Sequence, residues 1–94
     1  MNNLLSISEY SQLIGIPEQE LKGRSRIETI AIARQVYWYI LSIKGIGYRA
    51  ISRLADRTPA TVLSGIRSVK WLFDNNHPLI QDYTDIIQRI READ

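Results

Sequence analysis

The sequence predicts an all-α fold, a small bundle of about five to six helices that contains a helix-turn-helix. Three observations support this prediction. Apolar residues recur at the spacing of one helical face in several segments. Two stretches carry helix-start signals, Ser6–Glu9 and Thr58-Pro59. The longest apolar stretch, 27–43, is longer than a strand usually is. The 94 residues, 45% of them hydrophobic, contain no repeat or linker and predict one domain over 1–94.

The first 26 residues predict two short helices and a basic connector. Ser6 and Glu9 fit a capping box, which opens a helix that ends at Gly15. Pro17 begins a second turn of helix, which ends at Gly23. Arg24-Ser25-Arg26 follows with nothing apolar to bury. This segment is either a solvated loop or an arm that lies on a DNA backbone or enters a narrow, A·T-rich minor groove.

Residues 27–43 are apolar on most sides and predict a central helix that is buried on more than one side. Within it, Arg34 is open to two interpretations, a phosphate ligand or a rim residue whose charged end reaches water. Tyr37-Trp38-Tyr39 is expected in the core rather than as a base-stacking platform. Residues 44–47 predict a helix cap and turn, because they lack the Gly-Lys-Ser/Thr of a phosphate-binding loop.

Residues 48–73 predict two helices joined by a tight turn at Asp56-Arg57. The first is amphipathic and carries Arg49, Ser52 and Arg53 on its polar face. Thr58 before Pro59 starts the second. Its predicted buried face has the spacing i, i+4, i+7 and i+11, at Val62, Ile66, Val69 and Phe73. The rest of its surface is short, polar and basic, which suits contact with a phosphate surface. We interpret the pair as a helix-turn-helix; an ordinary helical hairpin is the alternative.

The end of the chain predicts a turn and a closing helix. Residues 74–78 form the turn, in which the single histidine, His77, is expected at the surface. Pro78 begins the last helix. Its expected buried stripe is Leu79, Ile80, Tyr83, Ile86, Ile87 and Ile90.

Charge is divided unevenly along the chain. Residues 22–73 hold ten Lys and Arg against Glu28 and Asp56, a net charge of +8, whereas the flanks carry a net charge of −6. This asymmetry indicates a polyanion-facing centre, although basic residues also solvate ordinary helix faces. The chain has no cysteine and one histidine, so we expect no metal, no cofactor and no enzyme activity. We expect no signal peptide, and no apolar run reaches membrane-spanning length, which predicts a cytoplasmic protein.

From Leu21 to Ile90 the order of features resembles the C-terminal, origin-binding domain of the bacterial replication initiator family, DnaA. A basic arm, a central helix with Ala33-Arg34-Gln35, a helix-turn-helix and a last amphipathic helix follow one another. The family signature Gly-Gly-Arg-Asp-His-Thr-Thr-Val corresponds to residues 55–62, with Arg57, Thr61 and Val62 matching.

The resemblance implies an all-helical fold related to the Trp repressor and binding to short duplex boxes, with Arg26 reading the minor groove. The chain departs from the family at Thr58-Pro59-Ala60, which replaces the Asp-His-Thr run that carries most base contacts. Proline has no N–H, and alanine has no hydrogen-bonding side chain, so direct readout of the family's box is weakened. The chain also lacks a nucleotide-binding segment, so we expect a stand-alone regulator, a phage or mobile-element protein, or an excised domain.

The expected function is binding of double-stranded DNA, sequence-specific and linked to replication initiation or its regulation. Phosphate contacts are predicted from Arg24, Arg34, Arg49, Arg53 and Lys70. The major groove is predicted to face Arg57, Thr58, Thr61 and Ser64. We expect a monomer with no membrane and no small-molecule substrate, and a replication protein is a second candidate partner. The alternative function is a degenerate initiator-like domain that acts as a protein-interaction module or transcriptional regulator.

Overall fold

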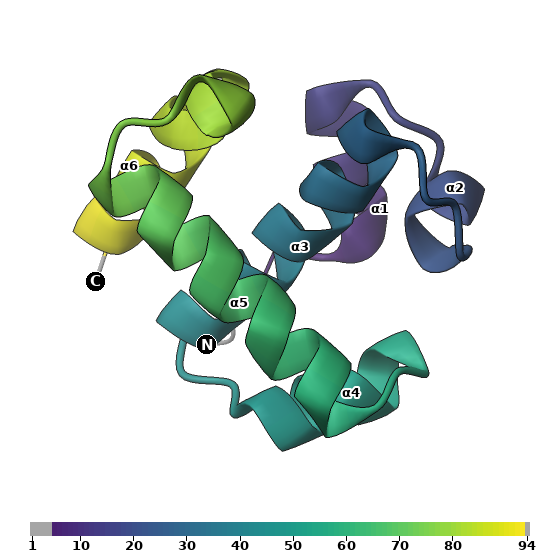
Figure 1. Ribbon diagram of the computed structural model, residues 1–94. Coiled ribbons are helices and arrows are strands. Elements are labelled where there is room, and N and C mark those ends of the chain that lie inside the picture. The colour runs from purple at the N-terminus through teal and green to yellow at the C-terminus, as the bar shows by residue number, and fades with distance from the viewer. Residues whose placement is uncertain (1–4, 94) are drawn as a thin grey trace.

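The computed structural model of the chain describes residues 5–93, which form six α-helices and one 3-10 helix and contain no strand. This confirms the predicted all-α fold. In chain order the elements are α1 (Ile7–Ile14), α2 (Glu18–Lys22), α3 (Glu28–Ile43), α4 (Tyr48–Ala55), α5 (Pro59–Asp74), η1 (Pro78–Tyr83) and α6 (Thr84–Glu92) (Figure 1).

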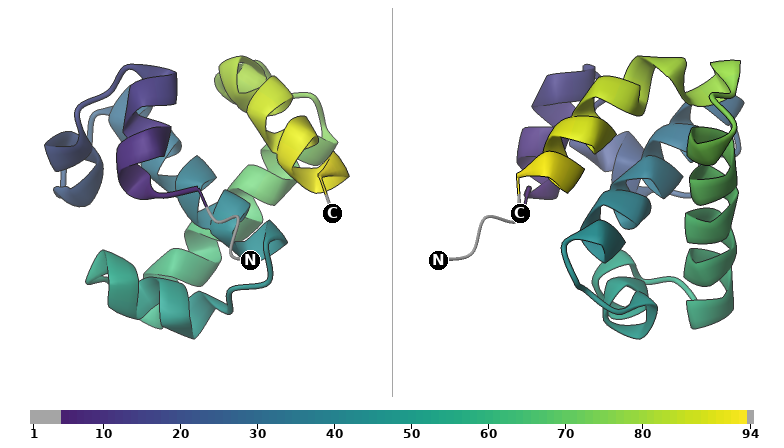
Figure 2. Two further views of the ribbon diagram at one scale, coloured as in Figure 1. Left: turned by 180° about the vertical axis from the view of Figure 1, so that it is seen from behind. Right: turned by 90° about the vertical axis from the view of Figure 1, so that its left-hand side faces the viewer.

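The central helix α3 joins two clusters of buried side chains. The larger cluster takes Val36 and Ile40 from α3 and packs them against Tyr10 of α1, Val69 of α5 and Ile87 of α6. The smaller cluster consists of Trp38 and Leu41 from α3, Ile51 from α4 and Val62 from α5. Figure 2 shows that α5 runs along one side of the molecule and that α1 and α6 lie on the opposite side.

The start and stop signals in the sequence act as predicted. Ser6 caps α1 in a complete capping box with Glu9, and Gly15 ends the helix in the left-handed conformation, with φ 76°. α2 ends at Gly23, and the turn after α3 contains Gly45 with φ 97°. Thr58 caps α5, and Pro59 occupies its first turn. These signals are local, so the sequence locates them without knowledge of the packing.

The buried face of α5 is displaced from the predicted one by the close approach of α3. Val62 and Val69 are fully buried as expected, but Ile66 and Phe73 are only half-buried, and Gly65 and Leu72 are buried in their place. A Cβ atom on Gly65 would lie 2.9 Å from Cε3 of Trp38 and 3.1 Å from Cγ of Gln35. The glycine therefore allows α5 to pack directly on the Trp38 ring.

We expect Gly65→Ala to lower the free energy of unfolding by about 1 kcal/mol. Overpacking against Trp38 costs about 1–3 kcal/mol, which outweighs the gain of about 1 kcal/mol in helix propensity. Urea denaturation followed by circular dichroism measures the change. Ser68→Ala is the control, because Ser68 lies on the exposed side of α5 and its replacement changes helix propensity without adding a contact to Trp38. A Gly65→Ala protein that is more stable than the unmodified chain would contradict the packing described here.

The last segment differs from the single helix that was predicted. Residues 78–83 form the 3-10 helix η1, and α6 begins only at Thr84. Ile80 leaves helical geometry, with φ −115° and ψ 16°, and its side chain is fully buried. The bend therefore lies at a residue whose side chain belongs to the larger core cluster. His77 is half-buried, and its Nδ1 accepts a hydrogen bond of 3.1 Å from the Leu79 N–H, which caps η1.

Candidate nucleic-acid interface

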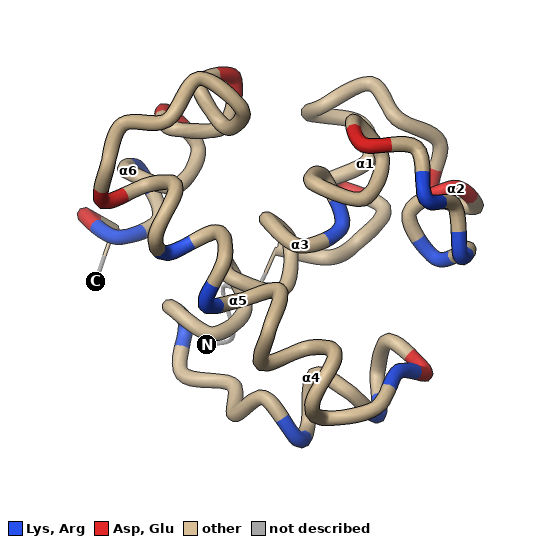
Figure 3. The backbone as a smooth tube through the Cα atoms, viewed as in Figure 1, with Lys and Arg blue, Asp and Glu red and all other residues tan. Residues whose placement is uncertain are grey.

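Arginines from three separate parts of the chain meet around the start of α5. The basic segment after α2, the exposed side of α4, the α4–α5 turn and the first turn of α5 line one open concave surface, which we call the tip groove. Its lining residues are Arg24, Arg49, Ser52, Arg53, Asp56, Arg57, Thr58, Pro59 and Thr61. Four arginines face a single carboxylate there. The acidic residues lie mostly toward the α1–α2 and η1–α6 end of the molecule (Figure 3).

The short turn before α5 is made by two capping residues. Asp56 ends α4 in the left-handed conformation, with φ 55°, which aspartate tolerates better than most residues. Thr58 then caps α5: its Oγ1 accepts a hydrogen bond of 3.2 Å from the Thr61 N–H. The hydroxyls of Thr58 and Thr61 lie 2.8 Å apart, and both residues are exposed. The positive end of the α5 dipole is therefore open to solvent within the tip groove.

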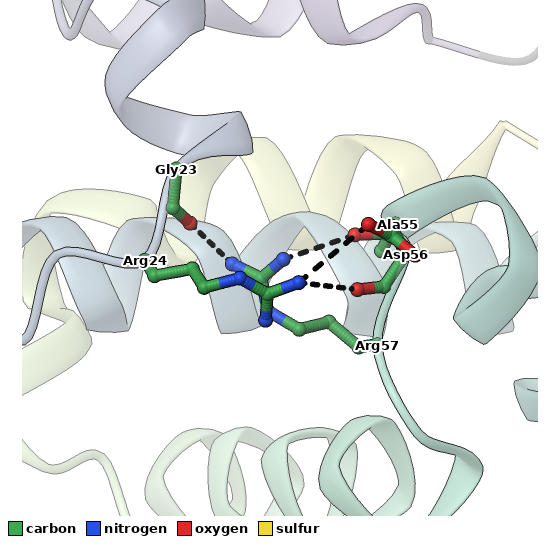
Figure 4. Close-up of polar contacts among 5 residues, drawn as sticks. All are labelled: Gly23, Arg24, Ala55, Asp56 and Arg57. Carbon is green, nitrogen blue, oxygen red and sulfur yellow. Dashed lines mark hydrogen bonds and ion pairs between the residues drawn. The ribbon is translucent and has the colours of Figure 1, made fainter.

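Arg57 bridges the C-terminal ends of two helices. Its Nη2 donates to the carbonyl of Gly23, which ends α2, and its Nη1 donates to the carbonyl of Ala55 at 3.1 Å, in the last turn of α4 (Figure 4). A cation is favourable at both positions, because unpaired carbonyls make the C-terminal end of a helix negative. Burial, followed by the charge of Arg24, lowers the pKa of the Arg57 guanidinium from its usual value.

Arg24 makes a second contact between the basic segment after α2 and the α4–α5 turn. Nη2 of Arg24 donates to the Asp56 carbonyl at 3.1 Å and lies 3.5 Å from Asp56 Oδ2 (Figure 4). Both side chains are mostly exposed, so this ion pair contributes at most about 1 kcal/mol. The bond from Arg57 is the more sheltered of the two links between the basic segment and the turn.

Arg34 takes a structural role of a kind that the sequence did not suggest. Its guanidinium donates to the carbonyls of Glu20 at 3.1 Å, Leu21 at 2.9 Å and Ser25 at 3.2 Å. Burial, with smaller contributions from Arg57 and Arg24, lowers its pKa. These three bonds fasten the end of α2 and the basic segment to α3, so Arg34 is better explained as a support for the segment than as a phosphate ligand.

Five predicted DNA contacts remain: Arg26, Arg49, Arg53, Ser64 and Lys70. Arg26, Arg49 and Arg53 are exposed, and their guanidinium groups have no hydrogen-bond or ion-pair partner among residues 5–93. The Arg49 guanidinium lies over the Tyr48 ring, 5.4 Å from its centroid. Ser64 is exposed farther along α5. Lys70 lies nine residues beyond Thr61, about 13 Å along the helix, and its Nζ contacts Asp74 at 2.8 Å. The structure thus separates Lys70 from the tip groove.

Two residues depart from the sequence interpretation. Ser52, expected on the polar face of α4, is buried, and its Oγ donates to the Arg49 carbonyl at 2.6 Å. Arg67 was absent from the predicted site, yet it is exposed beside Ser64 on the outer side of α5. The i, i+3 spacing of Ser64 and Arg67 was visible in the sequence and is the signal that could have identified it.

Similarity to a curated protein covers most of the chain. Over 67 residues the chain is similar to the chromosomal replication initiator protein DnaA of Kosmotoga olearia. The two sequences are 30% identical across this region, which is 70% of this chain and 15% of the initiator. The similarity supports a DnaA-like relation for most of this chain, and it leaves the larger part of the initiator without a counterpart here. No protein-family profile and no solved structure matches the chain.

Other kinds of site are not evident in the described part of the chain. Residues 5–93 contain no group of three or more histidine, aspartate or glutamate side chains that could hold a metal ion. None of the helices formed by these residues has both the length and the apolar character needed to cross a membrane.

Proposed function

We propose that this chain binds double-stranded DNA through the α4–α5 pair, acting as a helix-turn-helix, together with the basic segment 24–26. The observation that carries the proposal is the tip groove. Arg24, Arg49 and Arg53 converge there beside the exposed N-terminal end of α5. A groove of this charge suits the DNA backbone, and the open end of a helix dipole favours phosphate.

The exposed side of α5 suits the major groove. Thr61, Ser64 and Arg67 are exposed within two turns of one another. Hydroxyls pair with several base edges, and arginine pairs with guanine through two hydrogen bonds. Pro59 and Ala60 offer no hydrogen-bonding side chain. We therefore assign base readout to Thr61, Ser64 and Arg67. Arg26 is exposed on the neighbouring loop, and we assign it to the adjacent minor groove.

The biological process we propose is replication initiation or its regulation. Its support is the similarity to a chromosomal replication initiator over most of this chain. Because the match covers 15% of that initiator, we carry over only its link to replication initiation, and the proposal of duplex binding rests on the tip groove. The site would differ from the family's box, since Thr58-Pro59-Ala60 stands where the family carries its main base contacts.

Selection from a pool of randomised duplexes, followed by gel shift of the winners, tests the proposal. We expect enrichment of a short site with an A·T-rich segment beside a more variable core. Retention of duplexes that share no preferred sequence would mean that the chain binds DNA non-specifically. Failure to retain any duplex at low salt would overturn it.

One observation favours a second function, a protein-interaction module. The Thr58-Pro59-Ala60 replacement removes base contacts while the helical scaffold is intact. This function predicts no duplex retention at low salt and a stable complex with a purified replication protein in a pull-down. Retention of duplex DNA in the gel shift decides against it.

Arg26→Ala should weaken binding to A·T-rich duplexes by at least about fivefold and binding to G·C-rich duplexes less. The reason is that narrow A·T-rich minor grooves concentrate negative potential, which attracts an inserted arginine, and removal of one specific arginine contact costs about 1–3 kcal/mol. Fluorescence anisotropy with two labelled duplexes of equal length measures the difference. Equal effects on both duplexes would remove the minor-groove assignment.

A further inference from the structure

We propose that Arg57 is a positioning residue that fastens the basic segment 24–26 to the α4–α5 turn, so that Arg26 and α5 engage DNA as one rigid unit. The proposal rests on the proposed duplex-binding function and assigns to Arg57 a role different from the major-groove contact that the sequence predicted. It follows from the contacts of one guanidinium group with two helix ends.

Three arginines hold the basic segment from both sides. Arg57 donates to the carbonyl of Gly23, directly before the segment, and Arg34 donates to the carbonyl of Ser25 in its middle. Arg24 reaches in the opposite direction, from the segment to the Asp56 carbonyl. Arg26 comes next in the chain; it is exposed and has no hydrogen-bond or ion-pair partner among the described residues. The backbone is therefore anchored directly before Arg26, whose side chain makes no contact that would have to break on binding DNA.

The position of Arg57 opposes a role as a base reader. Its side chain is half-buried, and its guanidinium lies between the Gly23 and Ala55 carbonyls (Figure 4). Swinging outward to a base would leave both carbonyls without this donor at the negative ends of α2 and α4. Arg53 provides the contrast, since it lines the same groove, is exposed and has no such partner among residues 5–93.

Anchoring the segment affects the free energy of binding. A free arm loses conformational freedom when it enters a groove, whereas an arm that is ordered on folding has already lost it. The gain in affinity from Arg26 should then depend on the presence of Arg57. Two independent DNA contacts would instead give additive effects.

A double-mutant cycle tests this dependence on the duplex obtained by selection, with Arg57→Met, Arg26→Ala and the combination. Methionine keeps much of the aliphatic stem and removes the donors. We expect Arg26→Ala to weaken binding at least about fivefold in the unmodified chain and less than about twofold in the Arg57→Met background. Arg53→Met is the matched control: it removes one groove cation without touching the segment, and Arg26→Ala should keep its full effect there. Equal effects of Arg26→Ala in all three backgrounds would overturn the proposal.

Backbone ¹⁵N relaxation of the DNA-free protein gives a measurement that does not depend on duplex binding. We expect order parameters for Arg24, Ser25 and Arg26 near 0.85 in the unmodified chain and in Arg53→Met, and below about 0.6 in Arg57→Met. If Arg57→Met does not fold, Arg57→Lys replaces it in both measurements, because one ammonium group cannot reproduce the planar fork between two carbonyls. A rigid segment without Arg57 would overturn the positioning role. Absence of duplex binding by the unmodified chain would overturn the proposed function instead, and the relaxation result would still decide the role of Arg57.

Discussion

Replacing Arg49 and Arg53 together with alanine should lower affinity for duplex DNA on the order of 100-fold. Both arginines project from α4 into the tip groove, are exposed and have no ion-pair partner among the described residues. A hydrogen bond to a charged group contributes about 1.5–3 kcal/mol. Removing two such bonds to phosphate, each at the lower end of this range, costs about 3 kcal/mol, or two decades in Kd. Fluorescence anisotropy at fixed salt measures the decrease.

The matched control replaces Arg89 and Arg91, which changes the net charge by the same amount. Both lie on α6, outside the tip groove. We expect the control pair to alter duplex affinity less than about threefold, because charges more than a Debye length from the DNA are screened at about 0.1 M salt. Similar decreases in the two double variants would mean that net charge, not the tip groove, governs binding. The effect of replacing Arg53 should also be about equal on all duplex sequences, as for a phosphate contact.

Ile51→Ala should lower the free energy of unfolding by about 2–5 kcal/mol. Ile51 is fully buried and joins α4 to Trp38, Leu41 and Val62 in the smaller core cluster. Tyr48 and Ala55 also pack against that cluster, but Ile51 is the one fully buried apolar side chain that α4 contributes to it. A cavity there should loosen the α4–α5 pair and weaken duplex binding even at temperatures where the bundle remains helical. Chemical denaturation and anisotropy on the same sample measure both effects.

Leu54→Ala is the control on the same helix. Leu54 is 73% exposed, and its truncation should change stability by less than about 0.5 kcal/mol. Equal destabilisation by the two substitutions would contradict the orientation of α4 described here. Reduced stability in Ile51→Ala with unchanged duplex affinity would separate the α4–α5 packing from DNA binding.

The helices of this chain are well determined by local sequence. The Ser6–Glu9 capping box, Gly15, and Thr58 with Pro59 act within a few residues of themselves, so their effects were predictable. Gly65 is an example of a residue whose environment local sequence does not predict. Its burial depends on Trp38, 27 positions earlier in the chain, and helical periodicity carries no information on which side of α5 will meet that ring.

In the candidate site, too, local sequence predicted some residues correctly, and tertiary packing decided the others. Composition and charge indicated a basic centre, and the exposed arginines Arg26, Arg49 and Arg53 lie where a polar helix face or loop predicts them. Arg34 and Arg57 have the same side chain, yet they donate to backbone carbonyls from other elements. Whether an arginine faces solvent or a helix end depends on tertiary packing, which the sequence of its own helix does not encode. The bend at Ile80 was not predicted either; this residue departs from helical geometry and is fully buried.

The salt dependence of duplex binding tests the central claim most directly. If Arg24, Arg26, Arg49 and Arg53 neutralise about four phosphates, log affinity should fall against log salt concentration with a slope near −3.6. Titration of a labelled duplex from low to physiological salt, followed by fluorescence anisotropy, gives this slope. Each removal of Arg49 or Arg53 should make it shallower by about 0.9. A flat salt profile, or a slope that is unchanged without Arg49 and Arg53, would contradict duplex binding at the tip groove.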